Sequence, residues 1–442
     1  MKIKVDSRKI KKGDIFLDLT NNPVYVKDAI KNGAKKVIVK EGIYPIETKY
    51  VENPRQYYNN YLKKYYYKKI KNIKLIGITG TNGKTTTCYL IYQALNKLNI
   101  KCAYIGTIGF YLNGKKEELQ NTTPDIGELY EMLIKCQKEN IEYVVMEVSS
   151  HALDKNRIET LFYDFIIFTN LTQDHLDYHK TMENYLKCKQ QLFTKGKKTC
   201  KYIVNNDDKY NKYFLNSKSI TYGFKKSNYI LHLIKQEFTK TIFSVNNEKY
   251  ETTLLGNYNL YNLGVCILLL KELNFSYKEI KKIIKEIVAP PGRMERISTS
   301  NNQIIIDYAH TPDAVENILK TVKELPVSNI ITILGCGGNR DKLKRPIMGD
   351  IATKYSSKVI FTSDNPRDEN PKTILEDMTK NLEQSNYQII VNRKIAIKKG
   401  IQSLTKNDIL LVLGKGHETY QIIKNKKMYF SDREIVLECI RR

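Results

Sequence analysis

A glycine loop followed by a lysine is the first stretch with recognisable chemistry. It reads GTNGKTTT, residues 80–87, and it lies between an apolar run, Leu75 to Ile78, and an amphipathic helical pattern. A strand, loop and helix in this order direct backbone N–H groups and a helix N-terminus toward a phosphate. Lys84 would reach the outer phosphates, and the Thr85 hydroxyl would ligate Mg²⁺. An ordinary Gly-Lys turn is the alternative, since Ile occupies position 78 where the strict motif has Gly, but the flanking pattern favours phosphate binding.

An acidic and an imidazole side chain follow two further apolar runs. The run Ile141 to Val148 contains Glu147 near its end, and the run Phe165 to Phe168 leads to His175. Ligands of open α/β sheets bind beyond the carboxyl ends of the strands, so we expect both groups at the same edge as Lys84. Carboxylate and imidazole groups suit a Mg²⁺ site, directly or through water. Either residue alone is more often an ordinary loop residue, and the expected convergence of three strand ends favours the metal site.

Lys189 lies on the apolar face of a predicted helix, Thr181 to Phe193, with Leu186 three residues before it and Leu192 three after. Burial would lower the pKa of its amine and leave a reactive neutral group. A lysine whose stem covers apolar surface while its amine reaches water is an equally good interpretation of the pattern.

Polar loops also follow the strands predicted in the last third of the chain. We expect strands at 304–306, 330–334, 359–362, 388–391 and 409–413, with helices between them, which indicates a mostly parallel sheet with right-handed crossovers. The loops read DYAH (307–310), GCGGNRDK (335–342), DNPR (364–367) and GKGHE (414–418). Such edges carry binding sites, although DNPR alone is more often an Asn-Pro turn with a solvated arginine.

Length and composition indicate an α/β protein of three domains, at 1–70, 71–291 and 292–442. In the first we expect strands at Lys2 to Val5, Asp14 to Leu17 and Lys36 to Lys40, a helix at 26–32, and a polar linker at 57–69. The longest apolar run, residues 265–270, is too short to span a membrane. Eight cysteines without a C-x-x-C pair indicate reduced thiols in the cytoplasm.

The net charge of +26 would suit a nucleic-acid partner. Lysine, however, is spread along the whole chain, and no helicase, RRM, KH or zinc motif is visible. We therefore interpret the charge mostly as solvated surface, with a steering role for a polyanionic substrate.

The ordered motifs resemble the Mur ligase family and, within it, the MurE type. They are DSR, GTNGKTTT, NTTP, MEVSSHAL, TNLTQDHLDYH, CKQQLF, GNYNLYN, PGRMER, DYAHTPDA, GCGGNRDKLKRP, DNPR and GKGHE. The resemblance implies a small N-terminal α/β domain for a uridine-nucleotide peptide, a central ATP-binding parallel sheet, and a Rossmann-like C-terminal domain. It also implies an ATP-dependent amide ligase that adds a diamino acid to UDP-MurNAc-dipeptide through an acyl phosphate. We expect a cytoplasmic monomer with neither nucleic acid nor a membrane as a partner.

The resemblance assigns roles residue by residue. The catalytic residues are Lys84, Lys189 and His175. The ATP-binding residues are Gly80, Thr81, Asn82, Gly83, Lys84, Thr85, Thr86, Asn262, Arg293 and Asp307. The residues for the UDP substrate are Ser7, Arg8, Thr122, Thr123, Ser149 and Arg157. Those for the amino acid are Arg340, Asp364, Asn365, Arg367, Gly414 and Glu418.

The implied cofactors are ATP, two Mg²⁺ ions and CO₂ held as a carbamate on Lys189. The metal ligands would be Thr85, Glu147, His175 and the carbamylated Lys189. Arg367 favours meso-diaminopimelate, whose distal carboxylate suits a guanidinium. A lysine-adding ligase, a folylpolyglutamate synthetase and a nucleic-acid-dependent NTPase are the alternatives.

Overall fold

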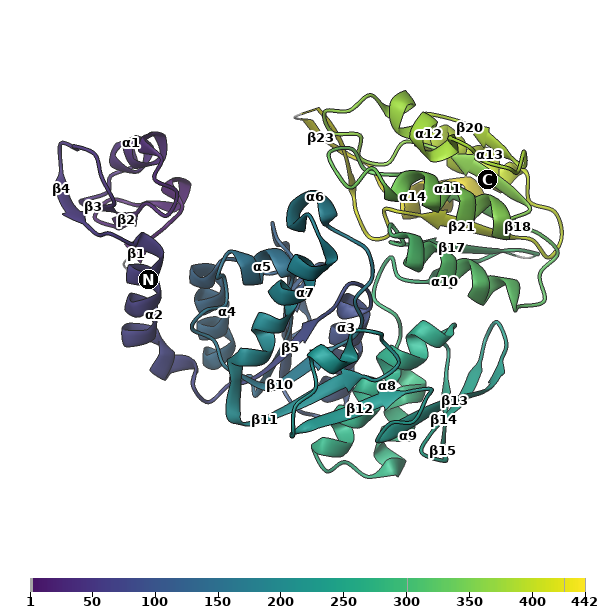
Figure 1. Cartoon of the computed structure of the whole chain (residues 1–442), viewed down its shortest axis with the longest axis horizontal. Coiled ribbons are helices and arrows are strands. Elements are labelled where there is room, and N and C mark those ends of the chain that lie inside the picture. The colour runs from purple at the N-terminus through teal and green to yellow at the C-terminus, as the bar shows by residue number, and fades with distance from the viewer. Residues whose placement is uncertain (1–2, 300, 425, 442) are drawn as a thin grey trace. The chain divides into compact units, whose positions relative to one another are not determined.

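The computed structural model describes residues 3–299, 301–424 and 426–441 (Figure 1). Two compact units are present. The first comprises Met1–Ile76, Ile100–Asp164 and Lys195–Cys200, and the second comprises Gly77–Asn99, Phe165–Thr194 and Lys201–Arg442. Strands β5 (Lys74–Thr79) and β10 (Tyr163–Phe168) each begin in the first unit and end in the second. The division into three domains stays a prediction.

The N-terminal part of the first unit is a small parallel sheet in the order β1-β2-β3-β4. Its strands are Ile3–Lys4, Ile15–Leu17, Lys36–Val39 and Glu47–Tyr50. Helix α1 (Pro23–Lys31) starts at an Asn22 cap and packs Val26 on Phe16 and Val37 of the sheet. The predicted strands are confirmed within a residue or two, and Lys2 lies outside the described residues.

The stretch 57–69 is part of a helix, so its prediction as a linker is wrong. Helix α2 (Pro54–Ile70) begins with an Asn53 cap and Pro at its first position, a strong start signal. Tyr58 and Leu62, one turn apart, are buried and anchor one face. Tyr and Lys are so abundant in this stretch that the one-turn spacing of its buried residues is not distinct in the sequence.

The rest of the first unit has a second sheet region in the order β9-β6-β7-β8, in which β6 and β9 are parallel. Its strands are β6 (Cys102–Gly106), β7 (Gly109–Leu112), β8 (Lys115–Glu117) and β9 (Tyr143–Glu147). Helices α4 (Ile126–Lys138) and α5 (Ser150–Asp154) accompany them. Glu147 thus ends a buried strand, as the sequence predicts.

The second unit continues from the glycine loop into α3 (Lys84–Lys97). Its other helices in this region are α6 (Leu176–His179), α7 (Met182–Gln190), α8 (Asn257–Glu272) and α9 (Tyr277–Glu286). Strand β11 (Gly196–Asn205) begins in the first unit and pairs in parallel with β12 (Ser219–Gly223), which pairs in parallel with β13 (Tyr229–Gln236). An antiparallel extension follows, with β14 (Thr241–Val245) and β15 (Glu248–Thr252).

The C-terminal sheet has the order β16-β17-β21-β18-β19-β20, parallel except for β16 at its edge. The strands are Glu295–Ser298, Gln303–Asp307, Ile409–Leu413, Ile330–Leu334, Lys358–Phe361 and Tyr387–Ile389 in that order. This confirms the predicted mostly parallel sheet. A ribbon of β22 (Tyr420–Ile423) and β23 (Lys426–Tyr429) follows β21.

Helices cover both faces of this sheet (Figure 1). One apolar cluster joins one face to α10 (Pro312–Lys323), α11 (Lys344–Tyr355) and α12 (Pro371–Thr379). A second joins the other face to α13 (Arg393–Gln402) and α14 (Asp432–Ile440). Alternate strand residues enter the two clusters, as the two-residue period of a strand requires. The loops at the strand ends are therefore carried by a rigid core.

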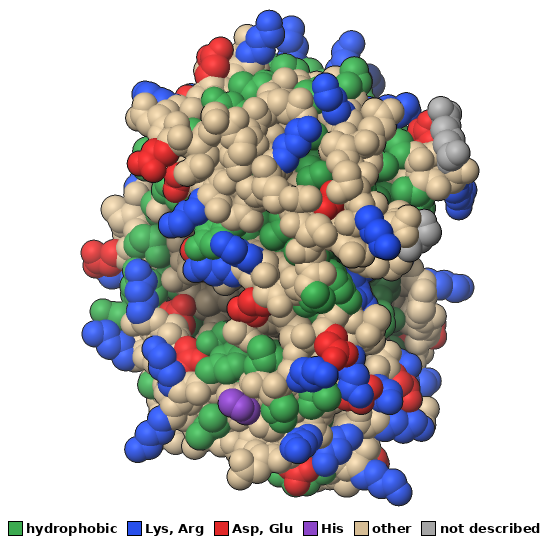
Figure 2. All heavy atoms as spheres, turned by 90° about the vertical axis from the view of Figure 1, so that its right-hand side faces the viewer, with side chains coloured by type: hydrophobic (Ala, Val, Ile, Leu, Met, Phe, Trp, Pro, Cys, Tyr) green, Lys and Arg blue, Asp and Glu red, His purple; other side chains and the backbone are tan. Residues whose placement is uncertain are grey.

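Lys and Arg side chains are dispersed over the face seen in Figure 2 and interspersed with acidic side chains. This distribution agrees with the interpretation of the charge as solvated surface. Among the described residues, no helix is long and apolar enough to cross a membrane.

Candidate active site

The loop between β5 and α3 is shaped by two glycines in the second unit. Gly80 has φ +153°, and a Cβ there would lie 1.9 Å from Thr169 Oγ1. Gly83 has φ +83°, and its Cβ would lie 2.7 Å from Asn262 Oδ1. A side chain at either position would therefore force the loop away from its neighbours. The loop therefore packs closely against Thr169 and Asn262.

Two backbone N–H groups of the loop bind the neighbouring residue Asn170. Thr81 N donates to Asn170 O, and Asn82 N donates to Asn170 Oδ1, both at 2.8 Å. Those two groups therefore hold the loop to its neighbour. Thr87 N donates to Gly83 O at 2.9 Å, so the hydrogen bonds of α3 begin at Gly83. Because helix N-termini attract anions, the first turn of α3 is the candidate phosphate site of the motif.

Two lysine amines meet at one backbone carbonyl. Lys84 Nζ donates to Gly80 O and Thr81 O, both at 2.8 Å, and Lys189 Nζ donates to Gly80 O at 2.7 Å. Lys189 is 1% exposed, which confirms the burial interpretation over a solvated amine. Burial first, and then the Lys84 charge, hold the pKa of Lys189 well below its ordinary value. This environment favours a neutral, nucleophilic amine.

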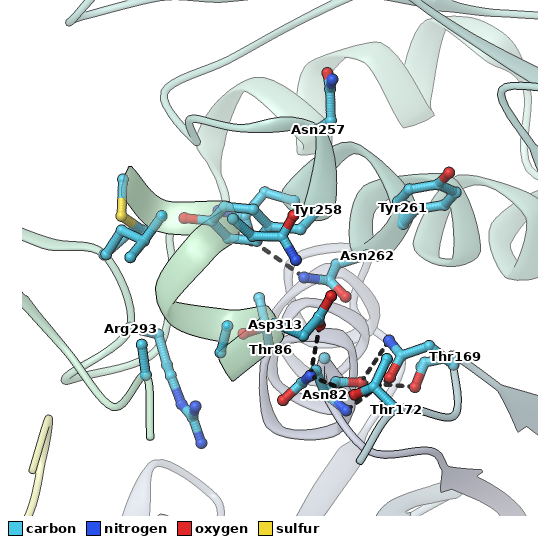
Figure 3. A pocket seen from close by; sticks show the side chains of 18 of the residues that line it. Asn82, Thr86, Thr169, Thr172, Asn257, Tyr258, Tyr261, Asn262, Arg293 and Asp313 are labelled. Carbon is cyan, nitrogen blue, oxygen red and sulfur yellow. Dashed lines mark hydrogen bonds between the residues drawn. The ribbon is translucent and has the colours of Figure 1, made fainter. Parts of the chain in front are cut away.

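A cavity of about 330 Å³ adjoins the loop (Figure 3). It is lined by Asn82, Gly83 and Thr86 from the motif and by Asn262, Arg293 and Asp307 from later segments. In Figure 3, Asn82 points to Asp313, and its Nδ2 donates to Asp313 Oδ2 at 2.9 Å. The structure therefore gathers six of the predicted ATP residues around one space.

Each of the three later residues is fixed by its own contacts. Asn262 Oδ1 accepts from Thr87 Oγ1 at 2.9 Å. Arg293 lies 4.5 Å over the Tyr308 ring and donates to Thr85 Oγ1 at 3.4 Å. Burial raises the pKa of Asp307, whose two oxygens accept from backbone N–H groups of Met294 and Ala309 at 2.7 Å. Asp307 therefore shapes the turn that carries Arg293.

His175 follows a buried carboxylate. Its Nε2 lies 3.3 Å from Asp174 Oδ2, and its side chain is 36% exposed. Burial opposes the charge of Asp174, yet His175, Lys344 and His310 together hold the pKa of Asp174 below its ordinary value. His175 also has φ +55°, in the left-handed region, where it forms the N-cap of α6.

Glu147 is fully buried in the first unit. Its Oε1 accepts from Tyr104 OH at 2.5 Å and from Thr107 N at 2.8 Å, and its Oε2 accepts from Thr107 Oγ1 at 3.0 Å. A Cβ at Gly106 would lie 2.2 Å from Oε1. The carboxylate is thus oriented by three donors, as a metal ligand or its neighbour would be.

Two predicted UDP-substrate motifs interlock in the first unit. Ser149 N donates to Thr123 Oγ1 at 3.0 Å, and Arg157 Nη1 donates to Thr123 O at 2.9 Å. Thr122 Oγ1 lies 3.1 Å from Thr107 Oγ1, which joins the group to Glu147. NTTP and MEVSSHAL therefore form one polar cluster, although they are far apart in sequence.

Ser7 and Arg8 lie in the N-terminal part of the first unit. Ser7 is buried, and its carbonyl accepts from Asn32 Nδ2 at 3.0 Å. Arg8 is exposed and forms a two-bond pair with Asp6, whose oxygens accept from Nε and Nη2 at 2.9 Å. Their role stays a prediction.

The predicted amino-acid residues gather at the ends of β19 and β21. Asn365 Nδ2 donates to Glu418 Oε2 at 2.8 Å, and a Cβ at Gly414 would lie 2.8 Å from Asp364 Oδ2. Burial raises the pKa of Asp364. Arg367 Nη1 donates to Gly338 O at 2.9 Å, on the loop that carries Arg340.

Lys415 is central to this cluster and was missed by the sequence reasoning. It is fully buried, and its Nζ donates to Glu418 Oε2 at 3.0 Å and to Asn365 Oδ1 at 3.2 Å. Its position in GKGHE was a usable signal, because a lysine between two glycines after a buried strand has few ways to reach solvent.

The cavity also has lining residues that were not predicted. They include Asp207, Asp208, Tyr258, Tyr261 and Asn317. Tyr261 OH donates to Asp207 Oδ2 at 2.6 Å. Tyr258 and Tyr261 belong to GNYNLYN, so that motif contained more site residues than Asn262 alone. Asp207 follows the buried end of β11, which is the signal that located Glu147.

Comparisons with known proteins bear directly on this arrangement. The family model for the Mur ligase middle domain matches residues 78–270, and the model for the Mur ligase glutamate ligase domain matches residues 292–416. The chain belongs to the Mur ligase family. The predicted membership and α/β fold class are confirmed.

Two relatives and one solved structure carry the same name. The chain is 39% identical over 466 residues to UDP-N-acetylmuramoyl-L-alanyl-D-glutamate–2,6-diaminopimelate ligase of Clostridium botulinum (strain ATCC 19397 / Type A), covering 100% of the chain and 95% of the relative. It is 40% identical over 460 residues to the enzyme of that name from Clostridium perfringens (strain 13 / Type A), covering 99% and 94%. A solved structure of a ligase with this name is 30% identical, with a TM-score of 0.69 over 99% of the chain and 94% of that protein.

Proposed function

We propose that this Mur ligase joins meso-2,6-diaminopimelate to UDP-MurNAc-L-Ala-D-Glu in an ATP-dependent reaction. The observation that carries the proposal is the similarity over nearly the whole chain to ligases whose name states these substrates. The second unit supports it with a nucleotide-sized cavity at a phosphate loop and a separate cluster containing Arg340 and Arg367. Cytoplasmic location and a monomeric state stay predictions.

The residues around the loop fit ATP and Mg²⁺. Gly80 and Gly83 let the loop lie against Thr169 and Asn262, where a side chain would clash, and the first turn of α3 would offer N–H groups to phosphate oxygens. The Thr85 hydroxyl and the His175 imidazole are suitable metal ligands of the second unit, and the buried Glu147 carboxylate is the candidate of the first unit. When bound, ATP supplies the phosphoryl group that activates a carboxylate, and Mg²⁺ neutralises the phosphate charges.

Lys84 would stabilise the transferred phosphoryl group. Its amine donates to Gly80 O and Thr81 O, so it exchanges neutral carbonyl acceptors for charged phosphate oxygens when nucleotide binds. Arg293 Nη2 donates to Thr85 Oγ1 at 3.4 Å, so its guanidinium would add a second cation to the same phosphates. Two fixed cations then meet the charge that develops in the transition state.

Lys189 would act as a carbamate. Its neutral amine attacks CO₂, a nitrogen–carbon bond forms, and the proton lost from nitrogen goes to solvent. The product is an anion close to the Lys84 cation, in a place where the unmodified amine is held neutral. A carbamate would therefore attract Lys84 and supply an oxygen ligand, which supports the expectation of two Mg²⁺ ions.

The final step joins the amino acid to the activated carboxyl group. The amine attacks the carbonyl carbon of the acyl phosphate, a C–N bond forms, the C–O bond to phosphate breaks, and a proton leaves the nitrogen. Arg340 and Arg367 would bind the distal carboxylate of diaminopimelate, while Asp364 and Glu418 would face its distal ammonium. Positioning the amine in this way replaces a bimolecular encounter by an oriented one.

The alternatives differ in the chemistry of the incoming group. L-Lysine ends in an ammonium, which the Arg367 guanidinium would repel. A folylpolyglutamate synthetase would add glutamate, and the names of the relatives favour the peptidoglycan substrate. A nucleic-acid-dependent NTPase is disfavoured by the dispersed charge in Figure 2.

Phosphate release from ATP tests the proposal. Release should require UDP-MurNAc-L-Ala-D-Glu together with diaminopimelate, and it should not respond to DNA or to folate with glutamate. Release that occurs equally without the nucleotide peptide would contradict the proposal.

A further inference from the structure

Two loops of the C-terminal sheet hold a pair of arginines close together. Arg340 lies on the loop after β18, and Arg367 lies on the loop after β19. A Cβ at Gly337 would lie 2.9 Å from Arg367 Nη1 and 3.7 Å from Arg340 Cγ, so the two side chains flank the same glycine. Burial first, and then the charge of Arg340, lower the pKa of Arg367. Two neighbouring guanidinium groups repel, so the surrounding structure must hold the loops in place.

A buried ion pair lies behind these loops. The Arg345 side chain, on α11, is fully buried. Its Nη1 and Nη2 donate to Glu369 Oε2 and Oε1, both at 2.9 Å, and Nη1 also donates to Asp377 Oδ2 at 2.8 Å. The two parallel bonds to Glu369 fix the direction of that carboxylate as well as its distance.

The pair connects both arginine loops. Glu369 follows Arg367 by two residues and also accepts from the Asn339 N–H, next to Arg340. On the other side, Arg345 Nη2 donates to Gly337 O at 3.3 Å. A direct contact closes the connection, because Gly338 N donates to Asn365 O at 2.9 Å. Arg345 and Glu369 therefore fix one loop to the other.

Arg367 is held in a backbone conformation that it would not adopt alone. Its φ is +50°, in the left-handed region that few residues other than Gly and Asn occupy. Ribbon strand β22 holds it there, since Arg367 N donates to Ile422 O at 3.0 Å and Lys424 N donates to Arg367 O at 2.6 Å. The direction of its guanidinium thus depends on contacts made on both sides of the residue.

We propose that Arg345 and Glu369 are a positioning pair that sets the separation of the Arg340 and Arg367 guanidinium groups, and so selects an amino acid with a distal carboxylate. The proposal rests on the function proposed above. Neither residue needs to touch the substrate. The pair acts by keeping two cations at the spacing that one carboxylate can bridge.

Asp377 provides a matched control. It lies on α12 and accepts from the same Arg345 Nη1, but it belongs to neither arginine loop. A general contribution of Arg345 to folding would be weakened by loss of either acid. The proposed role depends on Glu369 alone, because only Glu369 is continuous with the Arg367 loop and bonded to Asn339.

The test compares Glu369→Gln with Asp377→Asn in the full-length enzyme. We expect Glu369→Gln to raise the KM for diaminopimelate on the order of tenfold, with the KM for ATP within twofold of normal. The ratio of kcat/KM for diaminopimelate to that for L-lysine should fall with it. Asp377→Asn should leave all three quantities near those of the unmutated enzyme. Glu369→Asp keeps the charge and should give an intermediate KM.

Three outcomes would overturn the positioning role. They are an unchanged diaminopimelate KM in Glu369→Gln, an equal rise in Asp377→Asn, and an equal rise of the ATP and diaminopimelate KM values. Should Glu369→Gln fail to fold, the Glu369→Asp and Asp377→Asn pair decides in the same way. The unmutated enzyme distinguishes the proposed function from the positioning role. If it cannot use diaminopimelate, the proposed function is rejected. If it uses diaminopimelate normally and the variants have unchanged KM values, only the positioning role of Arg345 and Glu369 is rejected.

Discussion

The phosphate loop and the amino-acid cluster handle positive charge in different ways. Around Gly80, the amines of Lys84 and Lys189 donate to backbone carbonyls, which carry no net charge. Around Asn365, the buried Lys415 donates to the Glu418 carboxylate. A ligand with several negative charges suits the first region, and a ligand that carries both signs suits the second. The difference matches the two ligands proposed above, ATP and a diamino dicarboxylate.

The two regions should also differ in how much a substitution destabilises the fold. Removing an amine from the phosphate loop breaks bonds to neutral carbonyl acceptors and leaves no opposite charge unpaired, so the fold should tolerate it. Removing one member of a buried ion pair in the C-terminal cluster leaves an uncompensated charge, which typically costs about 3–5 kcal/mol. Substitutions in the phosphate loop should therefore weaken ligand binding without changing stability. Substitutions in the amino-acid cluster should lower both ligand binding and stability.

The largest effect is expected at Lys189. Lys189→Ala should abolish ligation, because it removes the proposed carbamate, and acetate or formate should partly restore activity by filling the vacated position. Lys187→Ala is the control, since Lys187 is exposed on the same helix. Near-normal phosphate release by Lys189→Ala in CO₂-depleted buffer would contradict the carbamate.

Lys84→Ala should lower kcat a hundredfold or more, through loss of about 3 kcal/mol of transition-state stabilisation. Its melting temperature should be nearly unchanged, since the Lys84 amine donates only to the neutral carbonyl groups of Gly80 and Thr81. Calorimetry without ATP should show nearly normal binding of UDP-MurNAc-dipeptide. Lys97→Ala, on the exposed part of α3, is the control. A marked loss of stability in Lys84→Ala would contradict the expected difference in stability between the two regions.

Arg367→Ala should raise the KM for diaminopimelate about 30-fold or more, because a charge-assisted bond to a carboxylate contributes about 2 kcal/mol. The KM for ATP should be nearly unchanged. Steady-state kinetics with each substrate varied in turn measures both values. Arg433→Ala, at an exposed arginine, should leave both values unaltered. A change confined to the ATP KM would show that Arg367 acts elsewhere.

The smallest effect concerns the pH dependence of stability at Glu369. Hydrogen bonding by Arg345 is the main cause that lowers the pKa of Glu369 to about 2 from 4.5. The unfolded chain binds the proton first as pH falls, so this stabilisation is present above about pH 4.5 and is lost toward pH 2. Urea unfolding at several pH values should show Glu369→Gln less stable at pH 7, with a difference that narrows below pH 4.5. If the difference in stability between Glu369→Gln and the unmutated enzyme widened as the pH fell, this prediction would be contradicted.

Much of the fold was predictable because its signals are local. The apolar runs that became β5, β9, β10, β18 and β21 ended in the polar residues that now line the candidate sites. Helix α2 was missed because its buried positions are Tyr and Leu within a run of Lys and Tyr, so that the apolar face was not distinct.

The contacts that fix the sites could not be predicted from the sequence, because they join residues that are far apart in it. Glu147 is oriented by Thr107, forty residues earlier, and Asn365 is held by Lys415, fifty residues later. The left-handed backbone of Arg367 is imposed by β22 and not by its own sequence neighbours. Motif matching located the residues, and only the packed sheet shows how they are held.

The ratio of kcat/KM for meso-diaminopimelate to that for L-lysine in the unmutated enzyme tests the central claim most directly. Both rates are measured with saturating ATP and UDP-MurNAc-L-Ala-D-Glu. An interaction of one guanidinium with the distal carboxylate, absent for lysine, contributes about 2 kcal/mol and predicts a ratio of about 30 or more. A ratio near one, or a preference for L-lysine, would contradict the assignment of the Arg340 and Arg367 cluster to a distal carboxylate.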